Sequence, residues 1–140
     1  MKTWLVDTGP LVAYLDAADH SHSEVAACLD DFSGALATTG AVITEAMYLL
    51  ALSKDGPRTL AEFVTASGTE IYDLCQPPEL HEAVALMAKY LDTPMDFADA
   101  TLVLLAEALN VHEILTLDRR GFSTYRTRQR RHFQLVLDSP

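Results

Sequence analysis

The chain has 140 residues, of which 49% are hydrophobic and 8% aromatic, and it carries a formal net charge of −10. This length predicts one globular domain spanning residues 1–140. A chain of this size buries about two-thirds of its unfolded surface on folding, so it needs no disulfide or metal cross-links to form a core. The acidic balance argues against a protein that binds nucleic acid or anionic lipid through bulk charge alone.

The first half of the chain predicts strands that alternate with helices. A short apolar run ends at Asp7, and the turn-forming sequence Thr8-Gly9-Pro10 follows it. Glu45 is the only charged residue between Phe32 and Ser53. The predicted elements are strands over 4–6 and 35–38 and helices over 11–15, 23–32, 40–53 and 58–66.

The second half continues the alternation. Thr93 is predicted to cap a helix that begins at Pro94 and runs to about residue 109. An apolar strand then ends at Asp118. The remaining predicted elements are strands over 70–74, 114–117 and 133–137, a helix over 77–91 and a basic loop over 123–132.

Strands that alternate with helices favour an α/β fold with right-handed crossovers. We therefore predict a three-layer α/β/α sandwich with a mainly parallel central sheet. In such sheets ligands bind beyond the carboxyl ends of the strands. Asp7 and Asp118 both occupy such ends in this interpretation.

Four acids stand out from their surroundings. Three of them also have a structural explanation: Asp7 could cap a helix, Asp118 could form a turn, and Asp99 could interact with the positive end of a helix dipole. Glu45 is the hardest to explain structurally, because a lone acid on an apolar helix face is rare unless it is paired or binds a metal.

A shared cation explains the four acids together. No lysine or arginine adjoins Asp7, Glu45 or Asp99 in the sequence, and carboxylates gathered in one crevice repel one another. Hard divalent cations such as Mg²⁺ or Mn²⁺ prefer oxygen ligands, and the sequence has no His/Cys grouping that would favour zinc.

Four segments in order give the chain a family resemblance: LVDTGPLVAYLDAADHSH, TEAMYLLAL, DFADATLVLLAEAL and ILTLDRRGFSTYR. From Leu5 to about Tyr125 the sequence resembles the PIN-domain family, and more narrowly the VapC-type toxins of bacterial toxin–antitoxin pairs. The resemblance implies a PIN-like fold and a Mg²⁺- or Mn²⁺-dependent endoribonuclease that leaves a 5′-phosphate and a 3′-hydroxyl.

The resemblance also implies roles for particular residues. Family acids fall on Asp7, Glu45, Asp99 and Asp118, of which Glu45 would bind or orient water and the others would hold the cation. Small polar supports fall on Thr8 and Thr116. Asp96 matches a position that is often acidic, although a helix cap explains it equally well, and Gly121 replaces an acid that many members carry.

One basic segment interrupts the acidic chain. Six of the ten Lys and Arg residues lie between Arg119 and Arg131, without an acid among them. This segment could follow an RNA backbone, with Phe122 or Tyr125 stacking on bases, and a solvated basic face explains it equally well. The RNA-binding candidates are Arg119, Arg120, Arg126 and Arg128.

Partners and alternatives follow from the same resemblance. Members of the family usually dimerise and are inhibited by a small antitoxin, so we expect a homodimer and a VapB-like partner. The principal alternative is a PIN-like scaffold that has lost catalysis and serves as an interaction module for protein or RNA. An aspartyl-phosphate enzyme is less well supported, because Asp7-Thr8-Gly9 lacks a second acid.

The expected location is the cytoplasm. Cys28 and Cys75 are isolated, which argues against a disulfide framework and favours a reducing compartment. The apolar run before Asp7 is too short for a signal peptide, and no stretch is long enough to span a bilayer.

Overall fold

The structure is a computed structural model that describes residues 1–138. Five parallel strands form one sheet in the order β3-β2-β1-β4-β5. Their bounds are β1 Thr3–Val6, β2 Ala35–Thr39, β3 Glu70–Tyr72, β4 Glu113–Leu115 and β5 Gln134–Leu135. The chain moves outwards from β1 to β3 and then returns to the other side of β1, so the strand order reverses between β1 and β4.

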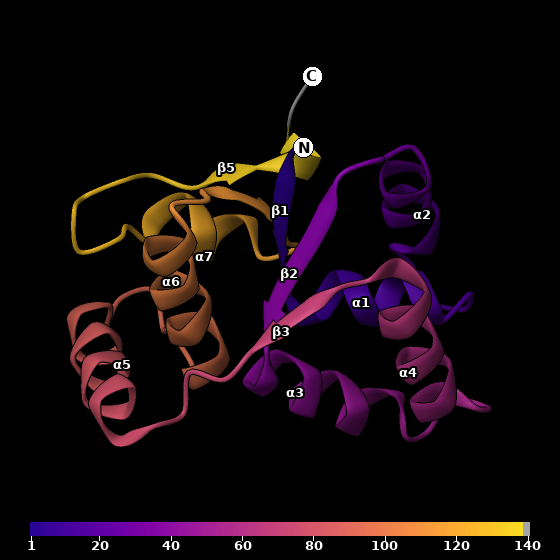
Figure 1. Cartoon of the computed structure of the whole chain (residues 1–140), viewed down its shortest axis with the longest axis horizontal. Coiled ribbons are helices and arrows are strands. Elements are labelled where there is room, and N and C mark those ends of the chain that lie inside the picture. Colours follow the sequence, from indigo (N-terminus) through magenta and orange to yellow (C-terminus); the bar gives the residue numbers. More distant parts are fainter. Residues whose placement is uncertain (139–140) are drawn as a thin grey trace.

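Helices cover both faces of this sheet. Figure 1 shows α1, α2 and α4 on one side of the strands, α5, α6 and α7 on the other, and α3 below the sheet. Their bounds are α1 Thr8–Leu15, α2 His22–Asp30, α3 Gly40–Leu50, α4 Gly56–Ser67, α5 Pro77–Lys89, α6 Phe97–Leu109 and α7 Arg119–Thr124, with a final 3-10 turn at Val136–Asp138. The predicted three-layer α/β/α sandwich with a parallel sheet is confirmed.

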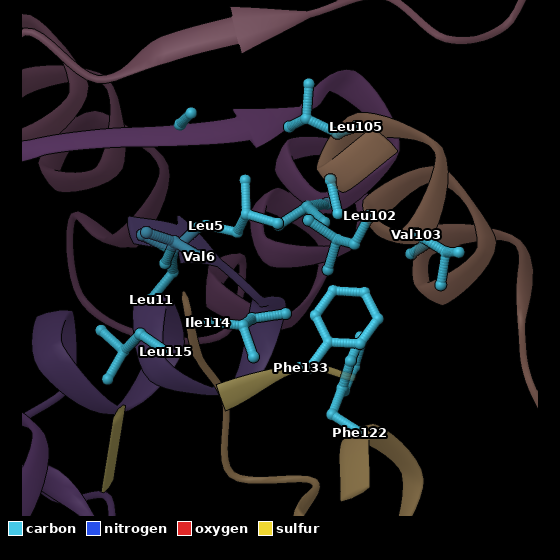
Figure 2. Close-up of a cluster of buried hydrophobic side chains, with 14 of the residues drawn as sticks. Leu5, Val6, Leu11, Leu102, Val103, Leu105, Ile114, Leu115, Phe122 and Phe133 are labelled. Atoms are coloured by element: carbon cyan, nitrogen blue, oxygen red, sulfur yellow. The ribbon is translucent and has the colours of Figure 1, made fainter. Parts of the chain in front are cut away.

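The core lies where α6 packs on the central strands. Leu102 and Leu105 of α6 are fully buried, as are Leu5 of β1 and Ile114 of β4. Figure 2 shows these side chains gathered between the two strands and the helix, with the rings of Phe122 and Phe133 beside them. Because α6 is buried on nearly all sides, its sequence FADATLVLLAEAL is almost uniformly apolar after its first turn.

Two helices begin at other residues than the sequence predicted. α1 starts at Thr8 instead of Leu11, because Asp7 caps it and proline is tolerated in a first turn at Pro10. α6 starts at Phe97 instead of Pro94, so Thr93 is not its cap.

The physical reason at α6 is a reciprocal pair of hydrogen bonds. Asp96 Oδ1 accepts from the Asp99 amide at 2.8 Å, and Asp99 Oδ2 accepts from the Asp96 amide at 3.1 Å. This capping box satisfies two backbone donors at the start of the helix. Asp96 is therefore a helix cap, which is the structural one of the two explanations given for this residue above.

Two further predictions about local structure are wrong. Arg119–Thr124 forms helix α7, where the sequence predicted a turn and a loop, because Asp118 caps it by accepting from the Gly121 amide. The sequence also predicts a buried face of Ala41, Val42 and Leu49 around Glu45. Val42 is fully buried, but Leu49 is 49% exposed, and Ala46 and Leu50 complete the inward face of α3.

Two expectations about the chain as a whole can also be compared with the structure. Cys28 and Cys75 are both free thiols. None of the helices within residues 1–138 is both long enough and apolar enough to traverse a bilayer.

Leu105→Ala tests the importance of the α6 contact with the sheet. Removing this fully buried side chain should lower the free energy of unfolding by about 2–5 kcal/mol, through lost burial and the cavity left behind. Leu52→Ala, the same change at a residue that is 98% exposed, should alter it by less than about 0.5 kcal/mol. Urea denaturation measures both, and equal effects would contradict this description of the core.

Candidate active site

The reversal of strand order places two acids side by side. Asp7 directly follows β1 and Asp118 follows β4 by three residues, and these strands are neighbours in the sheet. The crevice at such a reversal, beyond the carboxyl ends of the strands, is where ligands bind in open α/β sheets.

Asp7 is an unusual carboxylate because it is buried. Its side chain is only 7% exposed, and its two oxygens accept from the Thr8 amide at 2.8 Å and the Thr116 hydroxyl at 2.7 Å. Burial raises the pKa of Asp7 from 3.8 to about 6; these two hydrogen bonds lower it, and Asp96 and Asp118 raise it by repulsion.

Thr116 connects the two strand ends. Its hydroxyl donates to Asp7 Oδ2 and accepts from the Asp118 amide at 3.0 Å. Because Thr116 is fully buried, this hydroxyl fixes the two acids relative to each other. Thr116, for which the sequence resemblance implied a supporting role, thus contacts both acids.

Asp99 joins the same group from α6. Burial raises its pKa to about 8, and repulsion from Asp7 and then from Asp96 adds to the effect. We use the name acid site for Asp7, Asp96, Asp99 and Asp118. Three of its members cap helices: Asp7 caps α1, Asp96 caps α6 and Asp118 caps α7. The predicted capping interpretation of Asp7 is therefore correct and compatible with its membership of an acidic cluster.

Glu45 approaches the acid site from another direction. It is half-buried on α3 and lines a pocket of about 750 Å³ together with Asp96. The other residues of this pocket are Gly40, Ala41, Thr44, Tyr48, Cys75, Phe97 and Ala98. Glu45 thus lines the same pocket as Asp96, and the acids whose repulsion raises the pKa of Asp7 are Asp96 and Asp118.

The chemistry of these residues fits a hard divalent cation. The donors are carboxylate oxygens, and mutual repulsion makes their ionised forms unfavourable without a counter-charge. The hydroxyl of Thr8, next to Asp7, is buried and has no hydrogen-bond partner. The fit is therefore one of chemical type and not of arrangement, because within residues 1–138 no group of three or more His, Cys, Asp or Glu side chains is arranged to hold a metal ion.

The basic segment differs from its prediction. Phe122 and Tyr125 are 0% and 1% exposed, so neither is available to stack on a base. Arg128 pairs with Glu107 at 2.6 Å and with Glu82 at 3.4 Å, and Arg119 pairs with Glu24 at 3.0 Å.

The other two RNA-binding candidates, Arg120 and Arg126, differ in exposure. The Arg126 side chain donates to the Thr124 carbonyl and is half-buried. Arg120 is exposed at the start of α7.

Three buried threonines that support the site were missed by the sequence analysis. Thr39 caps α3, and its hydroxyl lies 2.9 Å from that of Thr101 on α6. Thr38 donates to the Val6 carbonyl of β1 at 2.7 Å. The available signal was their position at the end of an apolar strand and within an apolar helix, where a hydroxyl needs a partner.

Comparisons with known proteins agree with this geometry. The family model described as PIN domain matches residues 4–127. Ribonuclease VapC26 of Mycobacterium tuberculosis (strain ATCC 25618 / H37Rv) is 35% identical over 124 residues, which cover 87% of this chain and 91% of that protein.

Two solved structures share the fold. The crystal structure of Mycobacterium tuberculosis VapC20, described as a sarcin-ricin loop cleaving toxin, has a TM-score of 0.74 and 17% identity, over 84% of this chain and 91% of that one. The structure of FitAB bound to an IR36 DNA fragment has a TM-score of 0.60 and 18% identity, over 97% and 96%. The match over residues 4–127 and the identity to VapC26 together show that the chain belongs to the PIN-domain family.

Proposed function

We propose that the chain is an endoribonuclease that hydrolyses phosphodiester bonds with Mg²⁺ or Mn²⁺ and acts as the toxin of a type II toxin–antitoxin pair. The identity of 35% to Ribonuclease VapC26 supports the activity. The observation that carries the proposal is the buried carboxylate of Asp7, grouped with Asp96, Asp99 and Asp118 at the reversal of strand order.

Each acidic residue receives a role in this proposal. Asp7, Asp99 and Asp118 would hold the cation, Glu45 would contribute to its binding and orient the attacking water, and Asp96 would be auxiliary. A divalent cation supplies charge stabilisation for a reacting phosphate and lowers the pKa of a water ligand. Thr116 keeps Asp7 and Asp118 in register, and the free hydroxyl of Thr8 is a further oxygen donor beside them.

The helix ends favour an anionic substrate. α1 and α6 both direct their N-termini towards the acid site, because their caps Asp7 and Asp96 belong to it. Helix N-termini carry a partial positive charge and unpaired amides, which favour phosphate groups. Arg119 and Arg120 at the start of α7 are the arginines nearest to Asp118 in the chain, and we propose that they contact the RNA backbone.

Exposed apolar side chains are the evidence for protein partners. Tyr48 on α3 is 80% exposed and Val84 on α5 is 62% exposed. Large exposed hydrophobic residues of this kind mark interaction surfaces when they gather into patches. We propose that α3 and α5 contribute to a homodimer, and that a VapB-like antitoxin inserts a basic segment at the acid site.

Asp7→Asn tests the acid site directly. Asparagine keeps the size of the side chain and one of its two acceptor oxygens but removes the charge. Cleavage of RNA in Mn²⁺ should therefore fall by at least about 100-fold, as when a group that stabilises transition-state charge is removed. Asp92→Asn, the same change at an exposed acid, should leave the rate unchanged. A fluorogenic RNA cleavage assay measures both, and an Asp7→Asn variant with full activity would refute the mechanism.

The stability of the metal-free protein should fall as the pH rises. Asp7 and Asp99 have pKa values of about 6 and about 8 in the folded chain against 3.8 ordinarily, so the folded state retains protons that the unfolded state has lost. The free energy of unfolding therefore falls between about pH 4 and pH 8. Mn²⁺ should restore it at pH 8 by binding the ionised carboxylates.

Thermal melting in EDTA at pH 5 and pH 8, with and without Mn²⁺, measures this effect. We expect the Tm to be lower at pH 8 by on the order of 5 °C. The double variant Asp7→Asn/Asp99→Asn is the control, and it should lose both the acid-site contribution to the pH dependence and the response to Mn²⁺. If Mn²⁺ does not change the Tm of the wild type, the alternative of a PIN-like scaffold without catalysis is favoured.

Val84→Asp tests the dimer. Light scattering at micromolar concentration should give the mass of two chains for the wild type and of one chain for the variant, because a buried unpaired charge opposes association. Gln129→Asp places the same charge at an exposed residue of the loop after α7 and should remain dimeric. A monomeric wild type would contradict the dimer and leave the ribonuclease proposal intact.

A further inference from the structure

Tyr125, which the sequence suggested as a base-stacking residue, is a buried tyrosine that the proposed mechanism does not use. It follows α7 directly, and its amide donates to the Gly121 carbonyl at 2.8 Å. Its ring packs edge-on against Tyr90 and Phe122, with centroid distances of 5.1 and 5.2 Å. A side chain that is only 1% exposed is held in one orientation by these rings.

The hydroxyl of Tyr125 makes one long-range hydrogen bond. It donates to the carbonyl of Pro94 at 2.7 Å, across 31 residues of sequence. Pro94 lies two residues before Asp96, the cap of α6. Tyr125 lies at the other end of α7 from Asp118, which caps that helix. The bond therefore joins the segment that carries Asp96 and Asp99 to the segment that carries Asp118.

Electrostatics agree with this placement. Burial raises the pKa of the Tyr125 phenol, and four carboxylates raise it further: Asp99, Asp118, Asp96 and Asp7. All four members of the acid site therefore lie within electrostatic reach of the phenol. The hydroxyl stays protonated over the whole physiological range, so it acts only as a donor to Pro94.

We propose that Tyr125 is a positioning residue for the divalent cation: its hydrogen bond to Pro94 holds the segment that precedes α6 against the C-terminal end of α7. The proposal rests on the metal-dependent function proposed above. Without this bond the rings still pack, but the segment that leads into Asp96 and Asp99 loses a contact with the end of α7, the helix that Asp118 caps.

Tyr90 provides the comparison that separates positioning from general packing. Its hydroxyl accepts from the Arg126 amide at 3.0 Å and donates to the Arg126 carbonyl at 3.4 Å. It belongs to the same aromatic cluster and joins the end of α5 to the chain after α7. Its hydrogen bonds are to Arg126 and not to the segment that starts α6.

The experiment compares Tyr125→Phe with the matched variant Tyr90→Phe. Both substitutions keep the phenyl ring and its packing, so both chains should fold. Isothermal titration with Mn²⁺ in the absence of RNA should show about fivefold weaker binding for Tyr125→Phe, because part of the free energy of one buried hydrogen bond that orders the acids in the metal-free chain must then be supplied on binding. Tyr90→Phe should bind Mn²⁺ as the wild type does, although its Tm should also fall.

RNA cleavage gives a second measurement. For Tyr125→Phe the Mn²⁺ concentration for half-maximal rate should rise by a similar factor, and saturating Mn²⁺ should restore the rate with an unchanged KM for RNA. Equal Mn²⁺ affinity in Tyr125→Phe and the wild type would overturn the proposal. An equal loss of Mn²⁺ affinity in Tyr125→Phe and Tyr90→Phe would also overturn it, as would a wild type that binds no Mn²⁺. A wild type that binds Mn²⁺ and cuts no RNA would overturn the ribonuclease function alone, because the titration contains no RNA.

Discussion

The hydroxyl of Thr116 is the contact on which the acid site depends. It donates to Asp7 and accepts from the amide of Asp118, so one buried oxygen sets the spacing between the ends of β1 and β4. A threonine suits this place because its hydroxyl donates and accepts at once while its β-branched body fits a strand. Two loops that diverge from a strand reversal would otherwise leave their carboxylates free to separate under mutual repulsion.

The acids of the site have a structural function as well as the proposed chemical one. Asp7, Asp96 and Asp118 each satisfy amides at the start of a helix, which stabilises the fold locally. Gathering them beside Asp99 in a partly buried place raises the pKa values of Asp7 and Asp99, which destabilises their ionised forms. The capping bonds hold the carboxylates in place until a cation supplies the missing charge, so structural and chemical interpretations of these residues are not alternatives.

Features of the fold that depend on the local pattern of residues could be predicted from the sequence. Alternating strands and helices predicted the sandwich, and an apolar run that ends in an acid located Asp7 and Asp118 at strand ends, which the topology shows to be neighbours. Contacts between separate segments could not be predicted from such local patterns. Phe122 packs against Phe133 and Tyr125 against Tyr90, and without these contacts two aromatic residues in a basic segment looked like stacking residues. Helix α7 was missed for a similar reason, because its cap resembled a turn. The family resemblance supplied the proposed role of Glu45, which lines the same pocket as Asp96.

The charge distribution restricts how this chain could hold RNA. The net charge is −10, and Arg119 and Arg128 of the basic segment pair with acids of other helices. Affinity from phosphate neutralisation scales with the number of cationic groups that contact the backbone, so these ion pairs lower what Arg119 and Arg128 can contribute. In the proposed function, helix N-termini and a cation at the acid site would add attraction that acts over a few ångströms. A ribonuclease that relied on such short-range contacts would select a substrate whose shape presents one phosphate to the crevice, and it would gain less from the long, uniform charge of an RNA strand.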